Sequence, residues 1–171
     1  MNPVPVGLSQ LARMLITNRA HTLSTITAPL LVWEVPSAPS TEAAWVHTEA
    51  GHQSTRPRAG EPLVFNVEKV PGRKNAFSMG VTIGRVETND IQIDDSSVSR
   101  FHAFFQLDAK LAAWFLSDAD SKNGTFVDGI RLEKNEKVRL RDGAAVRFGD
   151  TAMKFVFAAS ITAFIDEMAA K

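Results

Sequence analysis

The stretch 142–157, DGAAVRFGDTAMKFVF, indicates the fold class of this chain. It holds two short apolar segments, and a two-residue turn pair, Asp142-Gly143, precedes the first of them. In an extended strand, successive side chains point to opposite faces, so an alternating pattern marks a strand. The alternation places Met153, Phe155 and Phe157 on one face and Lys154 and Val156 on the other. The stretch therefore predicts β-strands connected by a tight turn.

The same pattern of short apolar segments and turn pairs extends back to residue 61. Short segments rich in β-branched and aromatic residues follow one another, among them PLVFNVEKV, MGVTIGRV, DIQID, HAFFQLD and AAWFLSD. Turn pairs separate several of them, at Asn123-Gly124 and Asp128-Gly129 as well as at Asp142-Gly143. No helical period runs through this block. Residues 61–157 are therefore predicted to form an all-β, antiparallel β-sandwich, which argues against an α/β enzyme fold.

The flanking regions have a different pattern. Residues 1–60 are expected to be an N-terminal extension, with a short amphipathic helix in GLSQLARMLI, a strand near LLVWEV and a partly disordered linker rich in Pro, Ser and Gly. Residues 158–171 predict an amphipathic helix, since Ile161, Phe164, Ile165 and Met168 recur at helical spacing. This helix either packs on the sandwich or serves as an interaction helix.

Composition limits the class of protein. The chain has 171 residues, with 19 Lys+Arg against 19 Asp+Glu, so no large basic surface for nucleic acid or an anionic membrane is expected. There is no cysteine, which excludes disulfides and thiol catalysis and suits a reducing cytoplasm. The N-terminus lacks an early positive charge and reads poorly as a signal peptide. The apolar run 26–35 is too short to span a bilayer. A cytoplasmic location is therefore expected.

The stretch 94–105, DDSSVSRFHAFF, raises the question of catalysis. Ser99 and His102 lie near two carboxylates, but no oxyanion hole is signalled and no Gly-x-Ser-x-Gly elbow is present. His47 and His52 lie in a linker-like segment, where a four-ligand zinc site is not expected. The chain is therefore predicted to have no enzymatic activity, no metal and no cofactor.

A small anion-binding site fits better. Arg85 offers a planar fork of donors for phosphate oxygens, and Ser99 offers a hydroxyl and a backbone N–H. Asn123 has an amide that can bond a peptide backbone, while Arg100 and Lys122 add positive charge. All five lie at strand ends or in turns, where a sandwich groups its loops. The pattern predicts a site for an anion and a peptide.

Three motifs carry a resemblance to a known family. Gly84-Arg85, then Ser99-Arg100-Phe101-His102, then Asn123-Gly124-Thr125 occur in this order within an all-β block. In this the block 61–157 resembles a forkhead-associated (FHA) domain. The resemblance implies a β-sandwich that binds phosphothreonine peptides through loops at one end. The expected partners are a phosphothreonine-containing protein or peptide and a Ser/Thr kinase pathway, with no nucleic acid and no membrane.

The resemblance also implies a role for each matched residue. Arg85 and Ser99 would contact the phosphate, Arg100 and Lys122 would line the pocket, and Asn123 would bond the peptide main chain. The structural residues would be Gly84, His102 and Gly124. Lys122 stands where the family often has a small hydroxyl residue, and Asp128 stands where it often has asparagine.

Three alternatives remain open. The chain can be a family member that kept the fold and lost the ligand. It can be a structural or assembly protein that uses its terminal helices for partner contacts. It can also regulate itself, with Thr27 as the phosphorylated residue that the sandwich captures, because Leu30 follows three residues later.

Overall fold

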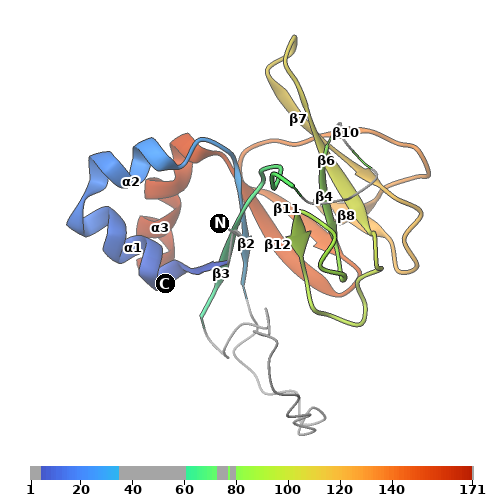
Figure 1. The fold of residues 1–171 in the computed structure, drawn as a ribbon, viewed down its shortest axis with the longest axis horizontal. Coiled ribbons are helices and arrows are strands. Elements are labelled where there is room, and N and C mark those ends of the chain that lie inside the picture. The colour runs from blue at the N-terminus through green and yellow to red at the C-terminus, as the bar shows by residue number, and fades with distance from the viewer. Residues whose placement is uncertain (1–4, 35–60, 73–76, 78–79, 171) are drawn as a thin grey trace, which may run out of the picture.

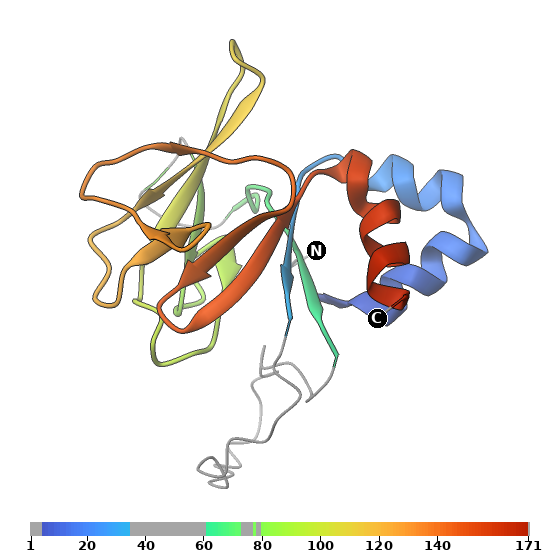
Figure 2. The same ribbon diagram turned by 180° about the vertical axis from the view of Figure 1, so that it is seen from behind.

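Two β-sheets and a layer of three helices make up the described part of the chain, which comprises residues 5–34, 61–72, 77 and 80–170 of this computed structural model. The helices are α1 (Leu8–Thr17), α2 (Arg19–Thr25) and α3 (Ile161–Ala169), and a short 3-10 turn, η1 (Ala158–Ser160), precedes α3. Figures 1 and 2 show the helices on one side of β2 and β3 and the remaining labelled strands of the sandwich on the other.

Sheet A has seven strands, and sheet B has five among the described residues. The order in sheet A is β1 (Val6–Gly7), β3 (Leu63–Asn66), β2 (Leu30–Trp33), β12 (Thr151–Val156), β11 (Ala144–Phe148), β8 (Thr125–Val127) and β9 (Ile130–Arg131). The order in sheet B is β10 (Val138–Arg139), β7 (Ala113–Asp118), β6 (Ala103–Asp108), β4 (Val81–Gly84) and β5 (Ile91–Gln92). All neighbours pair antiparallel except β4 and β5. The predicted antiparallel β-sandwich is confirmed.

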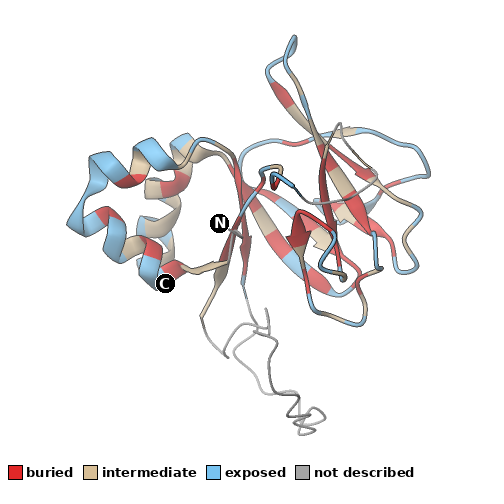
Figure 3. Cartoon of the chain, viewed as in Figure 1, coloured by how far each residue is buried: buried red, intermediate tan, exposed pale blue. Residues whose placement is uncertain are grey.

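The core between the sheets is aromatic. Phe105 from sheet B meets Phe148 and Phe155 from sheet A, with ring centres 6.2 Å apart in both pairs. All three rings are fully buried. In Figure 3 the buried residues, coloured red, lie largely on the strands of the two sheets. Met153 and Phe155 lie in this core while Val156 points to the opposite face, as the alternation predicts.

A second apolar core lies between the outer face of sheet A and the helices. Leu8, Leu11 and Leu15 of α1 and Ile161 of α3 pack against sheet residues, which are Leu30, Val32, Val64 and Val156. The helical spacing of the leucines on α1 gives the helix one apolar face, and this face packs on the apolar outer surface of sheet A. The predicted C-terminal helix is confirmed, and it packs on the chain's own sheet.

The boundary predicted at residue 61 differs from the structure. β2, Leu30–Trp33, lies within sheet A between β3 and β12, although it was expected in the extension. Its side chains are buried on both faces, because Leu31 and Trp33 enter the inner core and Leu30 and Val32 enter the second core. A continuous apolar run is typical of such a doubly covered strand. The linker expected after it, with His47 and His52, lies outside the described residues.

Thr27 lies in the connection between α2 and β2, and its side chain is exposed. Leu30 pairs with Val156 at the end of β12 that is remote from the β11–β12 hairpin. Five residue steps of strand β12 separate that end from the hairpin end, about 17 Å. Leu30, the residue that would be read after a phosphorylated Thr27, is only 1% exposed. This arrangement argues against capture of Thr27 by loops at the hairpin end of the same molecule.

Candidate functional site

Three loops meet at the hairpin end of the sandwich, and Ser99 joins them. The Arg85 N–H donates to the Ser99 carbonyl oxygen at 2.9 Å, and the Lys122 N–H donates to Ser99 Oγ at 3.0 Å. The Asn123 Nδ2 atom donates to the Ser97 carbonyl oxygen at 2.7 Å. The residues of three separate sequence motifs are thereby brought to one surface.

His102 contacts the Ser99 loop from the buried side and positions it. Its Nδ1 atom accepts the Ser99 backbone N–H at 2.9 Å, and its Nε2 atom lies 3.1 Å from the Gly124 carbonyl oxygen. Nδ1 therefore acts as the acceptor, and Nε2 carries the proton and donates it to Gly124. The ring is fully buried and meets Phe148 edge-on. One imidazole thus connects the serine loop to the Asn-Gly turn.

Burial lowers the pKa of His102 below its ordinary value, because the charged form is poorly solvated there. The hydrogen bond to Gly124 and the negative charge of Asp118 act in the opposite direction and only partly offset burial. The neutral imidazole is the form that can accept the Ser99 N–H. The low pKa therefore preserves the loop contact near neutral pH.

Asp118 organises the loop that carries Lys122 and Asn123. Its carboxylate accepts the Ser121 N–H at 2.9 Å, the Ser121 hydroxyl at 2.6 Å and the Thr125 hydroxyl at 2.5 Å. Burial alone would raise the pKa of Asp118, but these hydrogen bonds and the nearby His102 lower it below the ordinary value. The sequence analysis missed Asp118 and Ser121, although the S-D-x-D-S run carries the turn-forming residues that could have signalled them.

The Asn-Gly turn needs its glycine. Gly124 has a φ of +84°, a conformation that residues with a Cβ rarely adopt. Its N–H donates to Ser121 Oγ at 3.0 Å, and its carbonyl accepts the Gly149 N–H at 3.1 Å. This supports the structural role expected for Gly124.

Gly84 is required by close packing. A Cβ at this position would lie 2.4 Å from the Arg100 carbonyl oxygen and 2.8 Å from the Asn89 amide nitrogen. That amide donates to the Arg100 carbonyl at 2.7 Å and to the Val86 carbonyl at 2.9 Å, so Asn89 ties the loop after Arg85 to the serine loop. Asn89 was not predicted from the sequence either, since a lone asparagine in a turn carries no distinctive signal.

Ser97 is another contact residue that was not predicted. Its N–H and hydroxyl both bond Asp95 Oδ1, at 2.8 and 2.6 Å, and its hydroxyl accepts the Asp150 N–H at 2.9 Å. It also accepts the Asn123 side chain through its carbonyl oxygen. The D-x-S spacing is typical of a side-chain-stabilised turn and could have indicated this role.

The cationic side chains of the site face solvent. Arg85, Arg100 and Lys122 are exposed, as is Asn123. None of the three cations forms an ion pair among the residues that the structure describes. The Arg85 Nε atom donates to the Val98 carbonyl at 3.3 Å, which holds the guanidinium against the serine loop. The surface therefore has positive charge and hydrogen-bond donors available to an anion.

The geometry does not support a Ser-His nucleophile. His102 meets the backbone N–H of Ser99 instead of its hydroxyl, and its other nitrogen is used by Gly124. Asp95 bonds Ser97. Within the described ranges, no group of three or more His, Asp or Glu side chains is placed to hold a metal.

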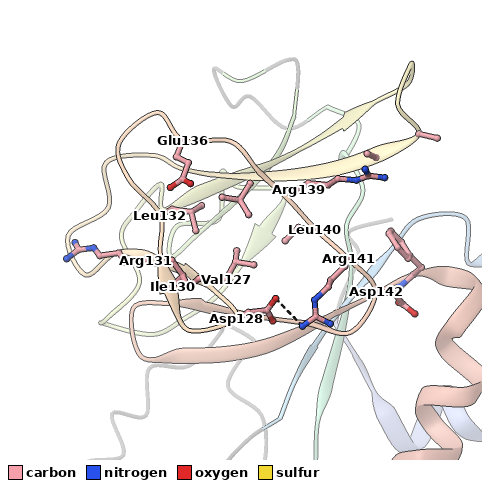
Figure 4. A pocket seen from close by; sticks show the side chains of 14 residues that line it. Val127, Asp128, Ile130, Arg131, Leu132, Glu136, Arg139, Leu140, Arg141 and Asp142 are labelled. Carbon is pink, nitrogen blue, oxygen red and sulfur yellow. Dashed lines mark hydrogen bonds and ion pairs between the residues drawn. The ribbon is translucent and has the colours of Figure 1, made fainter.

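A cleft of about 600 Å³ lies beside β8, β9, β10 and the segment 140–142 (Figure 4), and Arg131 is among the residues that line it. Its floor is apolar, with Val127, Leu132 and Leu140, and Asp128 forms an ion pair with Arg141 at its rim, 3.2 Å apart. None of the predicted site residues lines this cleft. The candidate site is instead an exposed surface formed by loops.

Comparisons with known proteins agree with the sequence motifs. The model of the FHA domain family matches residues 81–149. FhaB of Mycobacterium tuberculosis, an FHA domain-containing protein, is 34% identical over 100 residues, which are 58% of this chain and 62% of that protein. Vacuolar protein sorting-associated protein 64 of Saccharomyces cerevisiae is 29% identical over 114 residues, 65% of this chain and 18% of that protein. The chain thus spans less than two thirds of these relatives.

Two solved structures are among those to which this chain is similar. Mycobacterium tuberculosis EmbR in complex with a low affinity phosphopeptide is 32% identical, covering 46% of this chain and 20% of that chain, with a TM-score of 0.41. The FHA domain of CT664 from Chlamydia trachomatis is 20% identical, covering 75% of this chain and 97% of that chain, with a TM-score of 0.47.

Among the described residues, no helix has the length and hydropathy needed to cross a bilayer. The family match lies on the strands and loops that carry all three motifs, from β4 through the end of β11. Residues 81–149 of this chain therefore match the forkhead-associated (FHA) domain family.

Proposed function

We propose that this protein is a phosphothreonine-peptide-binding adaptor in Ser/Thr kinase-dependent signalling. One observation carries the proposal: Ser99 receives hydrogen bonds from the Arg85 and Lys122 backbones, so three distant motifs form one exposed, cationic loop surface. The FHA family match over residues 81–149 supports the same function. A kinase is implied because another protein must install the phosphate.

Each residue has a role in this proposal. The Arg85 guanidinium and the Ser99 hydroxyl bind the phosphate oxygens, and Arg100 and Lys122 line the phosphate pocket. Asn123 bonds the peptide main chain beside the phosphothreonine. One hydrogen of its Nδ2 atom already donates to the Ser97 carbonyl. The amide oxygen is left to accept a peptide N–H, and the second hydrogen is left to donate to a peptide carbonyl.

The expected affinity is micromolar. A phosphothreonine brings about −1.5 to −2 charges and three acceptor oxygens. Hydrogen bonds to charged groups contribute about 1.5–3 kcal/mol each. Two or three of them supply about 3–9 kcal/mol. A micromolar affinity corresponds to about −8 kcal/mol, so contacts along the peptide main chain must offset the cost of ordering the peptide.

The proposal includes no catalytic role for this surface. Both nitrogens of His102 are engaged in positioning the loops, so no base stands ready for the Ser99 hydroxyl. A cytoplasmic place of action is part of the proposal, since the absence of cysteine suits a reducing compartment. Packing of α1 and α3 against sheet A supports this proposal over an assembly protein that uses its terminal helices for partner contacts.

Calorimetry on matched peptides tests the proposal. A phosphothreonine peptide library is compared with unphosphorylated and phosphoserine versions, using wild type, Arg85→Ala and the control Arg139→Ala. Arg139 is an exposed arginine on β10, away from the site. Arg85→Ala should weaken phosphopeptide binding at least tenfold while Arg139→Ala leaves it unchanged. A wild-type chain that binds no phosphopeptide better than its unphosphorylated twin would contradict the proposal.

A further inference from the structure

Two arginines flank one aromatic ring on the part of sheet A that the helices leave uncovered. Phe126 of β8 pairs with Arg131 of β9 on one side and with Arg147 of β11 on the other, so the three side chains share the outward face. The Arg147 guanidinium carbon lies 3.5 Å from the centre of the Phe126 ring. The ring thereby fixes at least one of the two cations in place.

Neither cation is neutralised by a carboxylate within the part of the chain that the structure describes. The ion pairs there involve Lys69, Lys134 and Arg141. Asp150 is the exposed carboxylate nearest to Arg147 in the chain, and no ion pair joins the two. Arg131 is exposed and Arg147 is half-buried against the Phe126 ring, and neither charge is paired within the described residues.

This pair borders the proposed phosphopeptide surface. The Arg131 Nε atom lies 2.7 Å from the point where a Cβ on Gly124 would stand, and Gly124 follows Asn123 directly. Arg147 donates to the Gly149 carbonyl, and the Gly149 N–H bonds the Gly124 carbonyl at 3.1 Å. The positive surface therefore continues from Lys122 past Asn123 onto the open face of the sheet.

We propose that Arg131 and Arg147 form an acidic-residue subsite, which selects phosphothreonine peptides with glutamate or aspartate within about three residues of the phosphothreonine. The inference rests on the proposed function. Three residues of extended peptide span about 10 Å, enough to carry a side chain from Asn123 to the arginine pair. Arginine suits this role because its planar fork can bind a carboxylate through two hydrogen bonds.

The test uses one phosphothreonine sequence in three forms, with neutral flanks, with glutamates at positions −3 to −1, and with glutamates at +1 to +3. Each is titrated by calorimetry against wild type, the double variant Arg131→Gln/Arg147→Gln, and the double variant Arg131→Lys/Arg147→Lys. A double variant of two exposed helix arginines, Arg13→Gln/Arg19→Gln, serves as the control because it changes the net charge equally.

In wild type, one of the two acidic peptides should bind about three- to tenfold tighter than the neutral peptide. The glutamine variant should lose that gain yet bind the neutral phosphopeptide within about twofold of wild type. The lysine variant should keep most of the gain, and the helix control should keep all of it. The gain should also shrink at 0.5 M salt.

The outcomes separate this inference from the function on which it rests. If no phosphopeptide binds, the proposed function fails. If the neutral phosphopeptide binds and neither acidic form gains, or if the gain survives Arg131→Gln/Arg147→Gln, the subsite is refuted. A gain lost equally in the helix control would show a general charge effect and would also refute it.

Discussion

Replacement of His102 by alanine should both destabilise the fold and weaken peptide binding. The change leaves the Ser99 N–H without its acceptor and removes one of two bonds to the Gly124 carbonyl. A buried unsatisfied donor costs about 1–3 kcal/mol. Lost packing against Phe148 adds about 1 kcal/mol. The free energy of unfolding should therefore fall by about 2–4 kcal/mol.

Urea unfolding measures this loss, with linear extrapolation of the free energy to water. His102→Asn should fall between wild type and alanine, because its amide oxygen can replace Nδ1 as the acceptor but one short side chain cannot reach both loops. His21→Ala is the matched control, since His21 is exposed on α2, and it should change stability by less than about 0.5 kcal/mol.

Phosphopeptide affinity should fall about tenfold in His102→Ala even where the protein remains folded, because the Ser99 hydroxyl is no longer held in place. A His102→Ala protein within about 0.5 kcal/mol of wild type, with unchanged affinity, would refute the assigned role. Destabilisation with unchanged affinity would show that His102 supports the core alone.

Three further changes test other parts of the account. The contribution of His102 to the free energy of unfolding should be fully present above the unfolded-state pKa of histidine, about 6.5. It should fall as the pH drops below that value, because the unfolded chain takes up a proton that folded His102 accepts only at lower pH. Urea unfolding at pH 7.5 and 5.5 should therefore show a smaller drop in stability for His102→Asn than for wild type. Gly84→Ala should cost about 1–3 kcal/mol, since its Cβ would lie 2.4 Å from the Arg100 carbonyl oxygen, and a thermal melt no lower than that of wild type would contradict this. Ile161→Ala should lower the free energy of unfolding by about 2–5 kcal/mol, because Ile161 is fully buried in the second core. Ile16→Ala should be nearly neutral, because Ile16 is 86% exposed. Equal losses of stability in the two variants, measured by urea unfolding, would disprove the packing of the helices on sheet A.

The sandwich was predictable because its strands carry local signals. Alternation at Met153 and Phe155 and the turn pairs at Asn123-Gly124 and Asp142-Gly143 act over a few residues, so they can be read without the tertiary fold. Helical spacing on α1 and α3 was readable for the same reason. The sequence did not reveal that these helices cover the outer face of sheet A, because that face is assembled from strands that are distant in the sequence.

The strand boundary at β2 shows the limit of this approach. LLVW carries no alternation, since both of its faces are buried by different partners, and a short apolar run alone does not identify those partners. Thr27 was chosen as a regulatory residue from its spacing to Leu30. The three-dimensional pairing of Leu30 with Val156 argues against capture of Thr27 within the same molecule, and no sequence pattern reports this pairing.

The candidate site was also predictable only in part from the sequence. The cations and polar residues of its surface were identified from motif order and a family resemblance. Asp118, Ser121, Asn89 and Ser97, which hold the loops in place, act through side-chain to backbone hydrogen bonds that depend on the final loop geometry. The arginine pair around Phe126 depends on strand register between β9, β8 and β11, and so it too required the structure.

The central claim is phosphate-dependent binding by the Arg85–Ser99 loop surface. The most direct measurement is a calorimetric titration of the wild-type chain and Arg85→Ala with one phosphothreonine peptide and its unphosphorylated twin. The account predicts micromolar binding of the phosphopeptide to wild type, no measurable binding of the twin, and at least a tenfold loss in Arg85→Ala. Equal binding of both peptides, or an Arg85→Ala protein that binds as wild type does, would contradict it.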